Sequence, residues 1–146
     1  MNSLQKAVCL CVYDHRNGLM LAAHRKHDYS QWGMPGGKIE NNESSIQAII
    51  RETSEETPYL ITETSLKFIT KKICFGEINY LVDVYLIENP LYMAINTKIN
   101  SLEQNYGWIH PRLLTVGPFG KFNSELFKDF KDLIFGTTYD SLQWYN

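Results

Sequence analysis

Two short apolar runs open the chain and have the length of β-strands, "KAVCLCVY" at residues 6–13 and "LMLAAHR" at residues 19–25. The dipeptide Asn17-Gly18 between them is a signal for a tight hairpin turn. The residues that follow, 26–37, are polar and punctuated by Gly and Pro, so they are predicted to form a loop. The pattern thus predicts a hairpin that leads into a long loop.

A helix is predicted to begin near Ser44 and to end by Thr57. Ser44 and Gln47 have the spacing of a capping box, in which each side chain bonds to the backbone of the other residue. Pro58 disfavours helical geometry at the residue before it and cannot continue the helical hydrogen bonds. The side chains that recur at helical intervals and form the expected core face are Ile46, Ile49, Ile50 and Thr53.

The second half of the chain predicts another strand pair, a short strand and a final helix. Residues 66–75 and 78–87 are rich in strand-forming side chains and flank Gly76-Glu77, and residues 106–110 form a shorter strand candidate. Residues 123–135 place five apolar side chains on one helical face: Leu126, Phe127, Phe130, Leu133 and Ile134. A mixed sheet between helices, with α, β and α layers, is therefore expected.

Composition supports one globular unit. The 146 residues are 44% hydrophobic and 21% charged, and no linker or repeat divides residues 1–146, so a single domain is expected. The early run "AVCLCVY" is too short for a membrane span or a signal-peptide core. The cysteines Cys9, Cys11 and Cys74 lack paired spacing, which favours buried free thiols and a reducing, cytoplasmic location.

The formal net charge of -2 gives the chain no general attraction for nucleic acid. No extended nucleic-acid surface is therefore expected. No membrane contact is expected either, because the early apolar run is short. A polyanionic ligand would need local basic groups or metal ions. The sequence predicts no oligomeric state.

Three carboxylates, Glu52, Glu55 and Glu56, form a stripe beside the core face of the expected helix, where like charges repel. A solvated acidic surface is the ordinary interpretation of such a stripe. The preceding Gly36 and Gly37 change it, because a backbone without side chains can approach another group closely. Carboxylate and carbonyl oxygens are the ligands that Mg²⁺ or Mn²⁺ prefers, so a metal site becomes an alternative.

The spacing around this stripe resembles a known family signature. It is Gly37, five residues, Glu43, seven residues, Arg51-Glu52, two residues, and Glu55-Glu56. This resembles the Nudix box, G-x5-E-x7-R-E-U-x-E-E-x-G-U, over about residues 37–59, and "WGMPGGKIE" resembles the MutT-like branch. The resemblance implies the Nudix α/β/α sandwich, with a mixed β-sheet between helices.

The box departs from its pattern at three uncharged positions. Thr53 replaces a bulky apolar residue, Pro58 replaces the last Gly, and Tyr59 stands where an aliphatic residue is usual. Pro58 excludes the left-handed cap that Gly allows, so the helix exit must differ. Every charged position is kept, and loss of catalysis is not implied.

The resemblance implies a metal-dependent pyrophosphohydrolase that uses Mg²⁺ or Mn²⁺ on a small nucleotide. A MutT-like member would cleave a nucleoside triphosphate to the monophosphate and pyrophosphate. The alternatives are a hydrolase of ADP-ribose, dinucleoside polyphosphates or capped or triphosphorylated RNA 5′ ends, and a non-catalytic nucleotide-binding module. Such modules usually lose box carboxylates, which this chain retains.

The resemblance also implies roles for single residues. The metal ligands would be the Gly36 carbonyl with Glu52, Glu55, Glu56 and a loop carboxylate, Glu103. Glu52, Glu55 and Glu103 would be catalytic together with Arg51, which would orient the box carboxylates. Glu103 would be the general base, with Glu88 as a competing candidate and an ordinary surface acid as the alternative. Glu43 would have a structural role near the helix start.

Substrate contacts are expected from four residues. Arg25 and Lys38 would contact phosphates, with solvated surface as the alternative. The resemblance to MutT-like enzymes implies that Asn123 pairs with a purine edge, and Phe122 or Phe119 would supply an apolar wall. The alternative for Asn123 is a helix N-cap, at that residue or at Ser124.

Overall fold

The computed structural model describes residues 4–25, 28–96 and 105–144. Its strands are β1 (Gln5–Asp14), β2 (Leu19–Arg25), β3 (Asp28–Gly33), β4 (Gly36–Lys38), β5 (Tyr59–Leu60), β6 (Leu66–Cys74), β7 (Tyr80–Ile87), β8 (Ala94–Ile95) and β9 (Tyr106–Ile109). Its α-helices are α1 (Ser45–Glu56), α2 (Gly120–Asp129) and α3 (Lys131–Phe135), and short 3₁₀ turns include Pro111–Thr115.

The main sheet is mixed, as expected. Its strand order is β3-β2-β1-β7-β6, with β4 also paired to β1 and β9 to β2. β1 runs parallel to β7, from Gln5 opposite Tyr80 to Val12 opposite Ile87, whereas the other pairs are antiparallel. The two predicted hairpins, β1–β2 and β6–β7, and the short strand β9 are confirmed.

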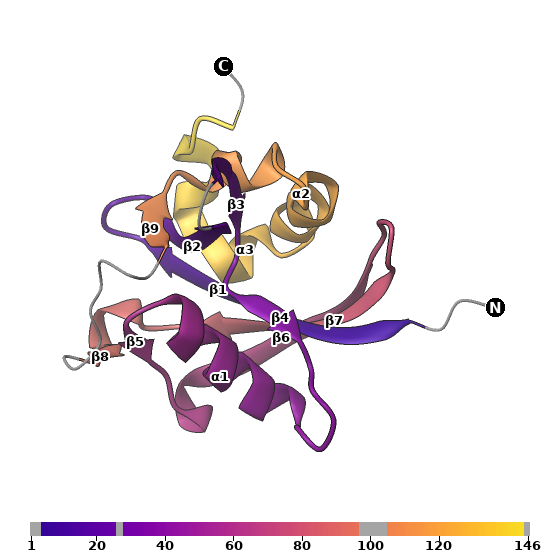
Figure 1. Ribbon diagram of the computed structural model, residues 1–146. Helices are drawn as coiled ribbons and strands as arrows, with labels where there is room; N and C mark the ends of the chain where they lie inside the picture. The colour runs from indigo at the N-terminus through magenta and orange to yellow at the C-terminus, as the bar shows by residue number, and fades with distance from the viewer. Residues whose placement is uncertain (1–3, 26–27, 97–104, 145–146) are drawn as a thin grey trace.

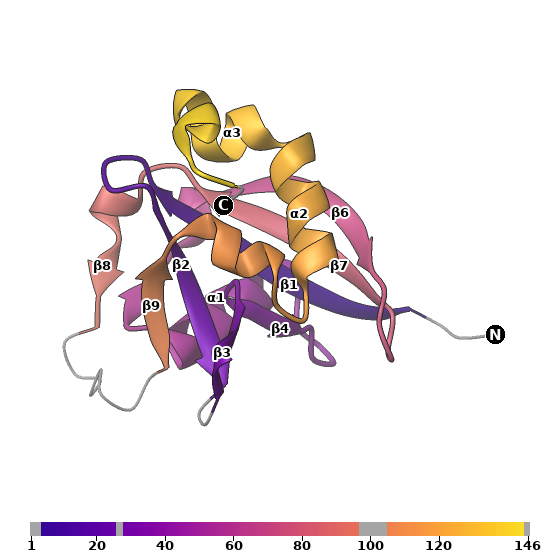
Figure 2. The same cartoon turned by 90° about the horizontal axis from the view of Figure 1, so that it is seen from above.

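Helices cover both faces of this sheet (Figure 1), and the view from above shows α2 and α3 over the face opposite α1 (Figure 2). The alternation of side chains along β1 explains the two cores. Val8 and Leu10 face α1 and belong to one buried cluster, whereas Cys9 and Cys11 face α2 and belong to the other. The expected α/β/α sandwich is confirmed.

Helix α1 follows the sequence pattern closely. The Ser44 hydroxyl accepts a hydrogen bond from the Gln47 amide, and the Gln47 side chain accepts one from the Ser44 amide, so the capping box is formed. Ile49 and Thr53 are fully buried, and Ile46 and Ile50 pack against the same core. The helix gives way at Thr57 to extended backbone, as Pro58 requires.

The unusual box residues each find a partner. The buried Thr53 hydroxyl donates to the Ile49 carbonyl at 2.7 Å, which satisfies it within the helix. Pro58 is buried, and Tyr59 begins β5, which pairs with β8. The Tyr59 hydroxyl accepts a hydrogen bond from the Trp108 indole at 2.8 Å. A tyrosine therefore joins the helix exit to β9 through a bond that an aliphatic residue could not make.

Two expected elements differ from the structure. The predicted loop over residues 26–37 contains β3 and the start of β4, because β2 and β1 supply backbone partners to segments without an apolar pattern. The single C-terminal helix is two helices, which separate at Phe130, and Leu133 is exposed rather than packed in the core. Side-chain periodicity did not reveal this change of direction.

Candidate active site

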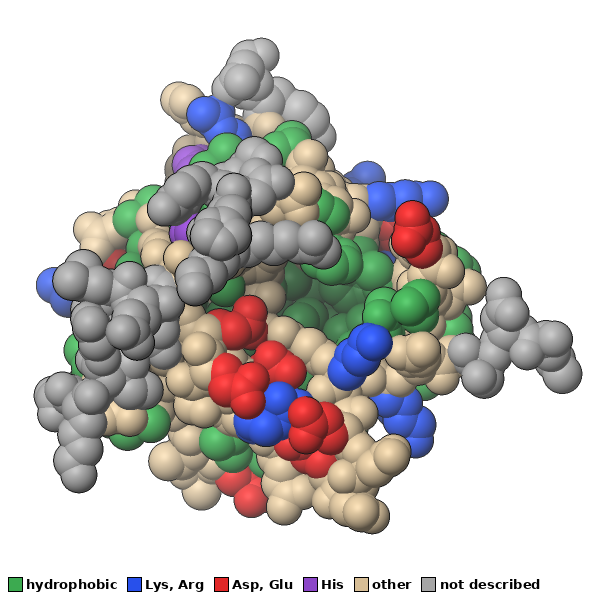
Figure 3. All heavy atoms as spheres, in the orientation of Figure 1, with side chains coloured by type: hydrophobic (Ala, Val, Ile, Leu, Met, Phe, Trp, Pro, Cys, Tyr) green, Lys and Arg blue, Asp and Glu red, His purple; other side chains and the backbone are tan. Residues whose placement is uncertain are grey.

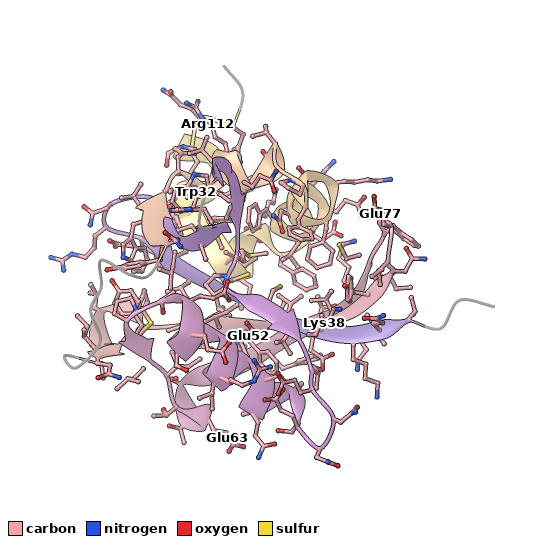
Figure 4. The ribbon with its side chains drawn as sticks, viewed as in Figure 1. Trp32, Lys38, Glu52, Glu63, Glu77 and Arg112 are labelled. Atoms are coloured by element: carbon pink, nitrogen blue, oxygen red, sulfur yellow. The ribbon has the colours of Figure 1, made fainter. Side chains whose placement is uncertain are left out.

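The acidic stripe of α1 lies against the two glycines of β4. The Glu56 carboxylate accepts a hydrogen bond from the Gly36 amide at 2.9 Å. A Cβ atom on Gly37 would lie 2.5 Å from Glu52 Oε1, so this carboxylate occupies the space that a side chain would take. Figure 4 shows Glu52 on α1 beside β4, with Lys38 close by. The helix and the strand together position both carboxylates.

Arg51 links the charged residues of this site. Its guanidinium binds both oxygens of Glu43, with Nε to Oε2 at 2.7 Å and Nη2 to Oε1 at 3.0 Å. Nη1 donates to Glu52 at 3.0 Å and to Glu55 at 3.4 Å, while Nη2 donates to the Lys38 carbonyl at 3.1 Å. Arg51 therefore contacts the carboxylates of Glu52 and Glu55, and Glu43 holds its guanidinium through two hydrogen bonds.

The carboxylates sit in environments that differ strongly. Burial raises the pKa of Glu56 to about 7, and the negative charges of Glu52 and Glu55 add to this, against the hydrogen bond from Gly36. Burial also raises the pKa of Glu52, although Arg51 opposes the shift. The hydrogen bonds from Arg51 lower the pKa of Glu43. Glu52 and Glu56 are thus the carboxylates of this site whose charged form is disfavoured by burial.

This donor set suits a hard divalent cation. Burial disfavours the charged forms of Glu52 and Glu56, so a nearby cation would stabilise these carboxylates. Because Gly37 has no side chain, the Glu52 carboxylate lies directly against the backbone of β4. Within residues 4–25, 28–96 and 105–144, no three acidic, histidine or cysteine side chains are arranged to share an ion. Glu55, whose side chain is 57% exposed, would have to turn inward to join such a site.

An apolar cavity of about 230 Å³ opens beside the carboxylates. Figure 3 shows the corresponding hollow, with hydrophobic walls, next to a group of acidic side chains. The cavity is lined by Ala7, Val8, Cys9, Met34, Gly36, Gly37, Lys38, Cys74, Tyr80, Val82, Phe119, Phe122 and Asn123. Three of the expected substrate residues, Lys38, Phe122 and Asn123, therefore lie together here.

Asn123 does not cap a helix, and the alternative of an N-cap at Asn123 or Ser124 is wrong. Helix α2 begins at Gly120, and the cap position belongs to Phe119. Asn123 is 2% exposed, and its Nδ2 donates to the Leu114 carbonyl at 2.9 Å. The helix begins earlier than predicted because Gly120 fits against the Thr115 carbonyl, where a Cβ atom would lie 2.5 Å away.

The remaining expected residues lie elsewhere or are not described. Arg25 ends β2, and its side chain lies outside the description. Glu103 falls in the stretch 97–104, outside the described residues, so its role stays a prediction. Glu88 follows β7, pairs with Lys67 at 3.3 Å and lines a different cavity from the one beside α1.

Several cavity residues escaped prediction from the sequence. Cys9, Cys74, Tyr80 and Val82 come from three strands and were not expected at a binding site. The cysteines are buried and free, as predicted, and burial raises the pKa of both thiols. The alternation along each strand indicates which residues share a face. It does not indicate that this face borders a cavity.

A second cavity, of about 350 Å³, also borders Gly36. It shares Met34, Gly36 and Phe119 with the first cavity and also includes Glu56. Its remaining walls come from Ala23, His24, Gln31, Trp32, Gly33 and Pro118. The acidic site therefore borders two hollows of different character, one almost wholly apolar and one with more polar groups.

No helix in the described part of the chain is both long and apolar enough to cross a membrane.

A curated 8-oxo-dGTP diphosphatase of Proteus vulgaris is 35% identical over 57 residues, which are 38% of this chain and 51% of that protein. The match thus spans about half the length of this relative.

Solved structures share the fold. The C. elegans Ap4A hydrolase has a TM-score of 0.61 at 23% identity, covering 90% of this chain and 99% of that one. The MutT protein from Bacillus halodurans has a TM-score of 0.60 at 22% identity, covering 86% and 80%. The profile of the NUDIX domain family matches residues 3–130. A match of that extent, joined to box residues that meet at one site, makes this chain a member of the NUDIX family.

Proposed function

We propose that this protein hydrolyses a nucleoside triphosphate to the monophosphate and pyrophosphate with Mg²⁺ or Mn²⁺. The observation that carries the proposal is the apolar cavity that borders the carboxylates of α1 and shares Gly36 and Gly37 with them. Its volume of about 230 Å³ is below the roughly 300–1,000 Å³ of pockets for drug-sized ligands. It therefore suits a nucleobase whose phosphates lie outside, along the charged residues.

The carboxylates would hold the cation. The proposed ligands are the Gly36 carbonyl, Glu52, Glu55 and Glu56, with Glu103 as a further ligand. A divalent ion bound there would neutralise phosphate charge and lower the pKa of a bound water. Arg51 keeps the box carboxylates in place through its contacts with Glu43 and Glu52.

Hydrolysis itself requires a base beside the reacting phosphorus. The oxygen of water forms a new bond to one phosphorus of the α–β anhydride while the bridging P–O bond breaks, which yields the monophosphate and pyrophosphate. Glu103 would accept the proton of the attacking water. Glu52, whose carboxylate lies against Gly37, would take this role if Glu103 does not. Lys38, at the cavity edge, and Arg25, at the end of β2, would bind the phosphate oxygens.

The base would lie between the sheet and α2. Phe122 supplies an apolar wall, and Asn123 is aligned by its bond to the Leu114 carbonyl. Because that bond uses Nδ2, the amide oxygen is the group that would accept an N–H of the base. The P. vulgaris relative is named for action on a purine nucleotide, which supports a purine here.

Product analysis tests this proposal. Purified protein is incubated with nucleoside triphosphates, ADP-ribose, dinucleoside polyphosphates and triphosphorylated RNA, with Mg²⁺ or with Mn²⁺, and products are separated by chromatography. We expect monophosphate and pyrophosphate from a triphosphate, and loss of this activity in Glu56→Gln. Release of inorganic phosphate alone, or equal activity in the variant, would contradict the proposal. Binding without hydrolysis would favour the non-catalytic module.

The second cavity favours one alternative, a dinucleoside polyphosphate or another nucleoside diphosphate carrying a second group. Trp32 and Phe119 offer aromatic surfaces on its walls, and Trp32 packs edge to face with His24 at 4.7 Å between ring centroids. Two groups joined by phosphates would then lie in the two cavities that share Gly36. Turnover of dinucleotides well above that of triphosphates, reduced by Trp32→Ala, would select this function.

We also place the protein in the cytoplasm. Its three buried free thiols suit a reducing compartment, where unpaired cysteines persist.

A further inference from the structure

Lys72 stands apart from the other lysines of the edge strand β6. Lys67 pairs with Glu88 at 3.3 Å and Lys71 with Asp83 at 3.1 Å, and their side chains are 48% and 53% exposed. Lys72 is 22% exposed and pairs at 2.7 Å with a residue of α2. Its ammonium is thus the most enclosed of the three, and it reaches across to the helix layer.

The strand register places Lys72 at the margin of the apolar cavity. Lys72 lies opposite Val82 on β7, which in turn lies opposite Ala7 on β1. Val82 and Ala7 both line the cavity. Side chains of one such row point to the same face of the sheet, so Lys72 ends the row that forms the cavity floor.

The ammonium of Lys72 joins two groups of α2. It donates to Glu125 Oε2 and lies 5.7 Å from the centroid of the Phe122 ring, within the range of a cation–π contact. Phe122 and Glu125 are three residues apart, so they share one helix face. Phe122 lines the cavity, and its neighbour Asn123 is tied to Leu114.

Two side-chain hydrogen bonds therefore connect helix α2 to neighbouring elements. Asn123 connects it to the 3₁₀ turn, and Glu125 connects it to Lys72 on the edge strand of the sheet. Phe122 is adjacent to Asn123 in the sequence and contacts Lys72, so both connections lie next to it. Phe122 also lines the cavity, whose opposite wall includes Ala7 and Val82 of the sheet.

We propose that Lys72, with Glu125, is a positioning residue that sets the width of the nucleobase pocket through Phe122. This inference rests on the proposed function, because it assumes that the cavity receives a base. Lys72 acts through another side chain and does not take part in phosphate chemistry. Its loss should therefore weaken nucleotide binding and leave the hydrolytic step unchanged.

Steady-state kinetics with the preferred nucleotide test the inference. In Lys72→Met, which keeps the length and apolar character of the stem, we expect KM to rise about fivefold, because the substitution removes both the ion pair and the cation–π interaction. The value of kcat should stay within about twofold of wild type. Lys67→Met, on the same strand but away from the cavity, is the matched control and should change neither value.

A double-mutant cycle adds a readout that a general loss of stability does not give. Glu125→Gln should raise KM as well, and Lys72→Met combined with Glu125→Gln should raise it less than the product of the single effects. A KM equal to wild type in Lys72→Met, or a fall in kcat that follows the melting temperature, would overturn the inference.

Calorimetric binding of a purine nucleoside 5′-monophosphate separates this inference from the proposed function. One outcome is that Lys72→Met binds the monophosphate fivefold more weakly than wild type, while wild type hydrolyses none of the nucleotides. That outcome would support the positioning role and contradict the proposed hydrolysis. Hydrolysis of a triphosphate with unchanged KM and unchanged monophosphate affinity would support the function and overturn the role of Lys72.

Discussion

At the scale of single residues, Arg51 determines how the charges of the site are arranged. Its planar guanidinium binds both oxygens of Glu43 and also reaches Glu52 and the Lys38 carbonyl. The position of Arg51 in the box could be predicted from spacing alone. Its pairing with Glu43 could not, because Glu43 precedes the helix and is brought near by the loop before Ser44.

Arg51→Lys is expected to weaken the proposed metal site. A lysine ammonium cannot reproduce the planar fork that holds Glu43 and Glu52 together. Loss of a residue that orients metal ligands typically costs about 10- to 100-fold in metal affinity or activity. When activity is measured against Mg²⁺ concentration, the concentration that gives half-maximal activity should rise by that factor in Arg51→Lys. Arg16→Lys, on the exposed β1–β2 turn, should give the wild-type curve. Identical Mg²⁺ curves for Arg51→Lys and wild type would refute the orienting role.

Glu103→Gln is expected to lower kcat by about 10²- to 10⁴-fold if Glu103 is the general base. Substrate affinity should change little, because the substitution keeps the shape of the side chain. Glu88→Gln is the matched control, since Glu88 is paired with Lys67 away from the cavity beside α1. Steady-state kinetics check both variants. An unaltered kcat in Glu103→Gln would pass the role of base to Glu52.

At the scale of elements, β4 is short and decides the geometry of the site. It pairs with β1, with Gly36 opposite Cys9 and Gly37 opposite Val8, and its glycines lie against the carboxylates of α1. Its sequence resembles a loop because glycines carry no side chain to show a strand pattern. Only the pairing partner β1 makes this segment a strand.

Its two glycines should respond differently to alanine. A Cβ atom on Gly37 meets the end of the flexible Glu52 side chain, so Gly37→Ala should fold normally, displace that carboxylate and lower kcat roughly a hundredfold. A Cβ atom on Gly36 would overlap the Val8 carbonyl oxygen, which is fixed backbone. Gly36→Ala should therefore lower the free energy of unfolding by about 1–3 kcal/mol or more. Thermal unfolding and kinetics of both variants check this contrast. Equal melting temperatures for the two variants would be incompatible with it.

At the scale of the whole molecule, the two helix layers contribute different groups to the site. The α1 layer carries the charged residues, the α2 layer forms one wall of the apolar cavity, and the sheet between them contributes to both. The site thus lies at β4, whose residues border the carboxylates of α1 and line the cavity together with Phe122 and Asn123 of α2. Folding brings like charges together there, which should affect the stability of the metal-free protein.

The metal-free protein is expected to lose stability as pH rises from about 4.5 to 7. Burial raises the pKa of Glu56 from an ordinary 4.5 to about 7 in the folded protein. Across that window the unfolded chain releases the proton while the folded chain keeps it, so the free energy of unfolding falls with rising pH. The loss contributed by Glu56 should reach up to about 3 kcal/mol. Chemical denaturation in a chelator at pH 5 and pH 8 measures it.

Glu56→Gln should abolish this part of the pH dependence and unfold at a higher temperature than wild type at pH 8 without metal. Glu63→Gln, an exposed carboxylate far from β4, should keep the wild-type profile (Figure 4). Adding Mg²⁺ at pH 8 should stabilise wild type more than Glu56→Gln, because an ion that binds only the folded state raises its stability. Equal pH profiles for wild type and Glu56→Gln would rule out this account of Glu56.

The sequence by itself determined the elements whose side-chain pattern repeats locally. The capping box at Ser44, the core face of α1, the stop at Pro58 and the hairpins all follow from interactions between residues close in the chain. The box spacing likewise placed Arg51, Glu52, Glu55 and Glu56 on one helix, because helical rotation is regular. These features need no knowledge of distant segments.

Only the tertiary structure decided what these elements meet. The strand character of β4, the break of the last helix at Phe130 and the early start of α2 at Gly120 depend on partners such as Val8 and Thr115. The cavity, too, arises from the distance between α2 and the sheet, where residues far apart in sequence come together. Local periodicity contains no information about such distances, because long-range packing sets them.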